Sequence, residues 1–110
     1  ESKPGGICHA CELETSLVMH LRPDLVKTER IVKTIPRLRT TWFSLDPDEE
    51  RKVELEHMMI ELTPTGVMGD PTLATPEKGK RFMDAITDRV AAFLCEFSTW
   101  TMDNLHTIES

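Results

Sequence analysis

The chain has no surplus of basic residues, and this absence bounds what it can bind. It carries 13 Lys and Arg against 19 Asp and Glu, so its formal net charge is −6 over 110 residues. Binding to nucleic-acid phosphates requires an excess of Lys and Arg on one face of the protein. We therefore expect no nucleic-acid partner.

Long apolar runs are also missing. No window approaches the roughly 18 consecutive apolar residues of a membrane-spanning helix, so we expect no membrane partner. The count of 3 cysteines is odd, which fits a secreted disulfide scaffold poorly and favours a reducing compartment, the cytoplasm. An apolar fraction of 39% and a charged fraction of 29% are typical of one folded domain at most.

A short helix is predicted from Glu14 to Leu21, where apolar residues recur on one helical face. Thr15 and Ser16 are residue types that cap helix N-termini. Pro23 should end this helix, because a proline inside it would remove a hydrogen bond and clash with the preceding turn.

A longer helix is predicted after Thr75 and Pro76, which are typical of an N-cap and of the first helical position. Apolar residues then recur at steps of three or four, and we expect this side of the helix to face a core. The stripe consists of Phe82, Ile86, Val90, Phe93 and Phe97.

The remaining segments carry weaker patterns. Residues 27–56 are charged and irregular, and we expect a surface excursion there with a short helix after Pro47. Residues 58–62 could form a strand. Residues 66–71 are rich in glycine, which indicates a tight connection with positive φ angles rather than an anion site.

Residues 8–16, with the sequence CHACELETS, gather a histidine, two cysteines and two glutamates just before the predicted short helix. The His9 imidazole could exchange a proton near neutral pH, although a loop histidine is more often an ordinary surface residue. Glu14 could orient His9 or a substrate amine, or it could simply interact with the helix dipole. Glu12 has the same chemistry, but a solvated glutamate is the plainer interpretation.

Cys8 and Cys11 form a single Cys-x-x-Cys motif. Such a pair can be half of a zinc site or a redox pair with a lowered thiol pKa. The chain has no second motif of this kind. Two small buried thiols are the favoured interpretation, and a small zinc or redox protein stays open as an alternative.

Two blocks together resemble the creatininase (creatinine amidohydrolase) family. The first is residues 8–26, where a histidine is followed by Glu-Thr-Ser at the start of a helix that ends in Arg-Pro-Asp-Leu-Val; the second is residues 66–79, GVMGDPTLATPEKG. Both lie in the C-terminal part of that family's domain. The resemblance identifies residues 1–97 as this part and leaves residues 98–110 as a tail.

The resemblance implies an α/β fold of three layers with a mostly parallel sheet, of which only the C-terminal part is present. It implies a hydrolase of cyclic amides or related C–N bonds that uses divalent metal ions such as zinc and manganese and forms homo-oligomers. His9 matches the family's proton-transferring residue and Glu14 matches the Glu of Glu-Thr-Ser. Cys8 and Glu12 are expected next to the substrate, although the position of Cys8 is often acidic in the family.

The motifs that carry the family's metal ligands are absent from these 110 residues, so no metal ligand is assigned here. The chain also begins with Glu1 rather than Met. We therefore expect the C-terminal portion of a hydrolase of small-molecule amides, inactive unless a complementing N-terminal half supplies the rest. The alternative is a non-catalytic remnant that acts as a binding or assembly module.

Overall fold

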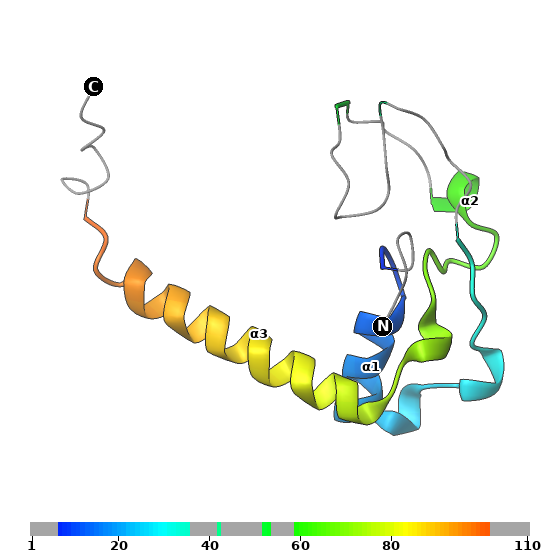
Figure 1. The fold of residues 1–110 in the computed structure, drawn as a ribbon, viewed down its shortest axis with the longest axis horizontal. Coiled ribbons are helices and arrows are strands. Elements are labelled where there is room, and N and C mark those ends of the chain that lie inside the picture. Colours follow the sequence, from blue (N-terminus) through cyan, green and yellow to red (C-terminus); the bar gives the residue numbers. More distant parts are fainter. Residues whose placement is uncertain (1–6, 36–41, 43–51, 54–58, 102–110) are drawn as a thin grey trace.

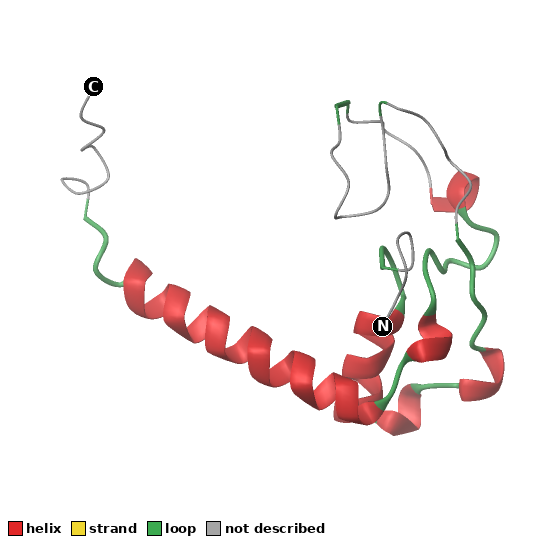
Figure 2. Cartoon of the chain, in the orientation of Figure 1, coloured by secondary structure: helices red, strands yellow, loops and turns green. Residues whose placement is uncertain are grey.

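The computed structural model describes residues 7–35, 42, 52–53 and 59–101, and this part of the chain is mostly helical (Figures 1 and 2). Its α-helices are α1 (Glu12–Leu21), α2 (Met59–Leu62) and α3 (Pro76–Phe97). Single 3-10 turns are formed by Pro23–Leu25, Thr28–Arg30 and Pro71–Leu73.

Helix α1 begins earlier than the sequence predicts. Cys11 is its N-cap, and the Glu14 side chain closes a capping box by accepting a hydrogen bond from the Cys11 backbone N–H at 3.0 Å. Thr15 and Ser16 lie inside the helix, so their expected capping role is wrong. The helix ends at Leu21, before Pro23, as predicted.

Helix α3 begins where the sequence predicts. Thr75 is the N-cap, its hydroxyl accepts a hydrogen bond from the Lys78 backbone N–H at 3.2 Å, and Pro76 occupies the first turn. The 22-residue helix lies against α1 at its N-terminal end and extends away from the rest of the described chain (Figure 1).

The apolar stripe of α3 does not face a core within the described part of the chain, contrary to expectation. α1 reaches only the first turns of α3, where Gly79 is buried. Beyond them the stripe is open, with relative exposures of 43% at Ile86, 50% at Val90, 52% at Phe93 and 53% at Phe97.

The mostly parallel sheet is not confirmed. Over the residues that the structure describes, the β-structure consists of two isolated antiparallel bridges, which pair His9 with Met68 and Thr34 with Gly69. The segment from Met59 to Leu62 is helical, so the expected strand is wrong there. So short an apolar run fits either periodicity, and the sequence could not decide between them.

The connection at residues 66–71 has the predicted positive φ angles, +81° at Gly66 and +147° at Gly69. It brings Met68 and Gly69 between two distant segments and so forms both bridges. The helix expected after Pro47 lies outside the described residues. Within the described ranges, no helix is long and apolar enough to cross a membrane.

Candidate functional site

His9 is held by its backbone next to the start of α1. Its N–H donates to the Met68 carbonyl and its carbonyl accepts from the Met68 N–H, each at 2.9 Å. The next residue, Ala10, has a φ of +50°, which is a strained conformation for a residue with a Cβ. This turn leads into the N-cap of α1 and leaves His9 exposed to solvent.

Glu14 faces back toward the turn that carries His9. One carboxylate oxygen, Oε2, accepts hydrogen bonds from the Cys11 backbone N–H at 3.0 Å and from the Cys11 thiol at 2.8 Å. Partial burial alone would raise the pKa of Glu14, but the hydrogen bonds and the positive potential of His9 outweigh it and hold the pKa below its ordinary value. Glu14 is therefore a carboxylate at neutral pH.

Cys11 is fully buried and behaves as a thiol. Burial, followed by the hydrogen bond to the Glu14 carboxylate, raises its pKa. A reactive cysteine needs the opposite shift, because the thiolate is the nucleophile. No disulfide involves Cys8, Cys11 or Cys95. The raised thiol pKa does not support the redox alternative, and over the described residues no group of three or more His, Cys, Asp or Glu side chains could hold zinc.

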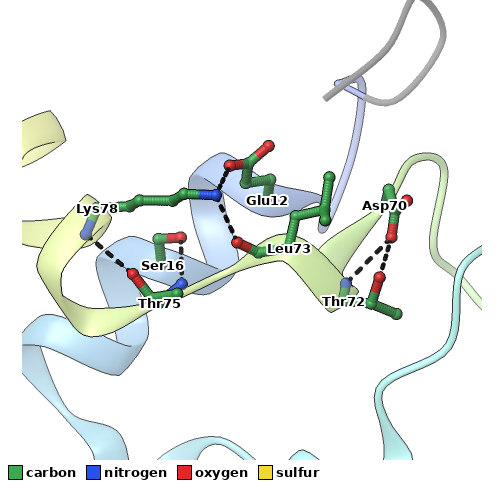
Figure 3. Close-up of polar contacts among 7 residues, drawn as sticks. All are labelled: Glu12, Ser16, Asp70, Thr72, Leu73, Thr75 and Lys78. Atoms are coloured by element: carbon green, nitrogen blue, oxygen red, sulfur yellow. Dashed lines mark hydrogen bonds and ion pairs between the residues drawn. The ribbon is translucent and has the colours of Figure 1, made fainter. Parts of the chain in front are cut away.

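Glu12 is buried rather than solvated. Its carboxylate accepts a hydrogen bond from the Lys78 ammonium at 2.5 Å, and the same ammonium donates to the Leu73 carbonyl at 2.8 Å (Figure 3). The Glu12 side chain is only 5% exposed. It therefore links α1 to the start of α3, while its expected contact with substrate stays a prediction.

The same junction contains two residues whose roles the sequence did not reveal. The Ser16 hydroxyl accepts a hydrogen bond from the Thr75 backbone N–H at 3.1 Å (Figure 3). A Cβ on Gly79 would lie 1.9 Å from the Ser16 carbonyl oxygen, so glycine is required for the close approach of the two helices. The sequence offered one sign of this close approach, a glycine in the first turn of a predicted helix.

Asp70 is the N-cap of the 3-10 turn Pro71–Leu73 in the connection that leads to α3. Its carboxylate accepts a hydrogen bond from the Thr72 backbone N–H at 3.2 Å (Figure 3). It also accepts one from the Lys33 ammonium at 2.6 Å. The Lys33 bond and then the Thr72 hydroxyl lower the pKa of Asp70. The connection thus presents a carboxylate, which supports its structural interpretation over an anion site.

An open hollow of about 340 Å³ lies beside the His9 turn. Ala10 and the negatively charged Glu14 border it, and Lys27 and Arg30 contribute positively charged side chains. Its other walls are mainly apolar, from Val18, Leu25, Val26, Ile31, Val32 and Val67. Its volume falls in the range of small-molecule sites, about 300–1,000 Å³. This hollow could not be predicted from the sequence, because residues 25–32 carry no periodic pattern.

The described residues do not fit a bound divalent metal ion. Over residues 7–35, 42, 52–53 and 59–101, no three His, Cys, Asp or Glu side chains gather in a group that could hold one. Hydrolytic metal sites use three or more protein ligands with an open coordination position. His9, in the turn before α1, and Glu14, in the first turn of α1, do not complete such a set.

Comparisons with known proteins agree on one family. The creatininase family, described as creatinine amidohydrolase, matches residues 1–94. The mycofactocin precursor peptide peptidase of Mycobacterium ulcerans (strain Agy99) is 29% identical over 106 residues, which cover 88% of this chain and 34% of that protein. The protein of the same name from Mycobacterium tuberculosis (strain ATCC 25618 / H37Rv) is 32% identical over 93 residues, covering 77% and 31%.

This chain thus spans about a third of the length of the curated relatives that it matches. No solved structure matches it.

Proposed function

This chain belongs to the creatininase family of hydrolases, and we propose that it forms the C-terminal part of an enzyme that hydrolyses an amide or related C–N bond. The observation that carries the proposal is the family match over residues 1–94, which includes His9 and the turn that presents it. The strained backbone at Ala10, next to His9, adds support, because such outliers cluster at functional sites.

In this proposal His9 is the proton-transfer residue. Its imidazole accepts a proton as water attacks the carbonyl carbon, and it returns that proton to the nitrogen as the C–N bond breaks. The products are a carboxylic acid and an amine, so one water is consumed. The solvent-exposed ring and the backbone bonds to Met68 suit this role, because the imidazole is accessible while its attachment is fixed.

Glu14 acts as a positioning residue. Its ionised carboxylate fixes Cys11 at the N-cap and thereby the turn that carries His9. Its negative charge also favours the imidazolium that forms when His9 holds the transferred proton. Cys8 and Glu12 remain proposed neighbours of the substrate, with Glu12 acting from its ion pair with Lys78.

The divalent metal that the family implies, zinc or manganese, is proposed to be held outside this chain. The described residues supply no fitting ligand set, and we derive no step through the metal. We propose that a complementing N-terminal region supplies these ligands and closes the hollow bordered by Ala10 and Glu14.

The proposed substrate is a small amide or a peptide. The mycobacterial relatives are named for a precursor peptide, and the hollow next to the His9 turn has the size of a small-molecule group. Its mostly apolar walls favour an apolar side chain or ring beside the scissile bond, and Lys27 and Arg30 favour a nearby carboxylate.

A chimera tests the proposal. This chain replaces the matching third of the Mycobacterium tuberculosis relative, and cleavage of that relative's precursor peptide is followed by mass spectrometry with added zinc or manganese. We expect hydrolysis by the chimera and none by the isolated chain. A folded chimera that binds metal and peptide but does not hydrolyse the peptide would show that the chain is a non-catalytic module.

A further inference from the structure

Met68 and Gly69 form a short linking segment between two parts of the chain that are distant in sequence. Met68 exchanges two backbone hydrogen bonds with His9, each at 2.9 Å. Gly69 exchanges two more with Thr34, at 2.7 and 3.0 Å. The backbone of this linking segment therefore joins the turn that carries His9 to the segment that ends at Thr34.

The turn after His9 needs support from both sides. The φ of +50° at Ala10 is unfavourable for a residue with a Cβ, and such a conformation persists only where the surrounding structure fixes it. On the C-terminal side, Glu14 fixes the Cys11 N-cap. On the N-terminal side, the bonds to Met68 fix His9. Whatever holds Met68 in place therefore also holds the His9 turn.

Asp70 anchors the linking segment at its C-terminal end. Its side chain is only 7% exposed, and Oδ2 accepts a hydrogen bond from the Lys33 ammonium at 2.6 Å. Oδ1 accepts hydrogen bonds from the backbone N–H and the hydroxyl of Thr72 (Figure 3). Because Lys33 directly precedes Thr34, the ion pair joins the same two segments as the Gly69 bridge and strengthens it.

We propose that Asp70 is a positioning residue for His9. Its bonds to Lys33 and Thr72 fix the end of the linking segment, and Met68 transmits this constraint to the strained turn through the backbone. Asp70 itself does not contact the substrate in this arrangement. The expected effect on catalysis rests on the proposed function, because it assumes that His9 transfers a proton, whereas the expected effect on the His9 turn does not.

Hydrogen–deuterium exchange of the full chain, followed residue by residue by NMR, tests the effect on the turn. Asp70→Asn keeps the shape of the side chain but removes the charge that binds the Lys33 ammonium. We expect the His9 and Met68 amides to exchange about tenfold faster or more, because their mutual bonds open more often. The Gly79 amide, which donates to the Thr75 carbonyl at the start of α3, should exchange at an unchanged rate.

Two variants of Lys33 keep the test decisive if Asp70→Asn does not fold. Lys33 is half exposed, so Lys33→Met should leave the chain folded and still speed exchange at His9 and Met68. Lys33→Arg keeps a positive donor and should restore slow exchange. Asp84→Asn, which removes an exposed pair with Lys80, is the matched control and should change none of these rates. Unchanged exchange at His9 and Met68, or an equal increase at Gly79, would overturn the proposal.

The catalytic effect is measured in the chimera with the Mycobacterium tuberculosis relative. Asp70→Asn and Lys33→Met should each lower kcat about tenfold or more, because a small displacement of a catalytic group is costly, with little change in peptide KM or metal content. Lys33→Arg should recover most of kcat. An unchanged kcat despite faster exchange would overturn the catalytic role of Asp70. A chimera that is inactive with the unmodified chain would contradict the proposed function instead, and the exchange rates would still decide whether Asp70 holds the His9 turn.

Discussion

The two ends of α3 differ in how well they are packed, and the more polar end is the better packed one. The first turns are polar and glycine-containing, yet they hold the best-packed junction of the described chain, with Gly79 against Ser16 and Lys78 paired with Glu12. The later turns are strongly apolar, yet they are exposed. Packing in the described chain follows close complementarity of small and polar groups, while the apolar residues of the later turns of α3 contribute little to it.

The largest expected effect comes from adding one methyl group at the packed end. In an exposed helix Gly→Ala stabilises by about 1 kcal/mol. Gly79→Ala should instead lower the unfolding free energy by about 3 kcal/mol, because the new Cβ would overlap the Ser16 carbonyl. Urea denaturation measures the change.

Ala91→Gly provides the control at the open end of the same helix. It should cost about 1 kcal/mol, which is helix propensity alone. A Gly79→Ala variant more stable than the unmodified chain would show that α1 and α3 do not approach as described.

Removing the buried charge pair should have the next largest effect. Lys78→Met deprives the 5%-exposed Glu12 carboxylate of its ammonium partner, and we expect a loss of about 2 kcal/mol, less than for a fully buried pair because Lys78 is 28% exposed. Adding Glu12→Gln should recover part of this loss.

Lys80→Met is the matched control. It removes an exposed pair with Asp84, 2.7 Å apart, and should change stability by at most about 0.5 kcal/mol. If Lys78→Met and Lys80→Met lowered the unfolding free energy equally, burial would not distinguish the two lysines.

Glu14→Gln should cost about 1 kcal/mol at neutral pH, because it replaces the charged capping group of α1. The folded-state pKa of Glu14 is lowered, so its contribution is present above the unfolded-state pKa of about 4.5 and is lost as the pH falls through the folded-state pKa. Stability measured between neutral and acidic pH should therefore decline less in Glu14→Gln. An unchanged decline would assign the acid sensitivity to other groups.

Val90→Ser at the open end of α3 should have the smallest effect on the unfolding free energy, at most about 0.5 kcal/mol, because Val90 is already 50% exposed. Thermal unfolding measures it. A loss comparable to that of Gly79→Ala would mean that Val90 is packed against other residues of the chain.

The sequence predicted the local features that depend on a few adjacent residues. The Thr75–Pro76 start of α3, the end of α1 before Pro23 and the positive φ angles at Gly66 and Gly69 all follow from residue type at one position. The predicted start of α1 was wrong because Glu14 reaches back to Cys11, and cysteine is not a residue type that indicates an N-cap.

Long-range features were beyond the sequence. The Glu12–Lys78 pair joins residues 66 positions apart, and the clash that requires glycine at residue 79 depends on how α1 crosses α3. Periodicity indicated the apolar face of α3 but could not say what covers it. At the candidate site, the family resemblance singled out His9 and Glu14, whereas the capping role of Glu14 and the neighbouring hollow needed the structure.

The most direct test of the account compares two histidine variants in the active chimera. His9→Gln should lower kcat by about 100-fold or more, the usual contribution of a proton-transfer group, without loss of metal or peptide binding. His20→Gln, at an exposed histidine near the end of α1 whose Cβ lies beside Gly79, should leave kcat unchanged. Equal rates for the two variants would contradict the role assigned to His9.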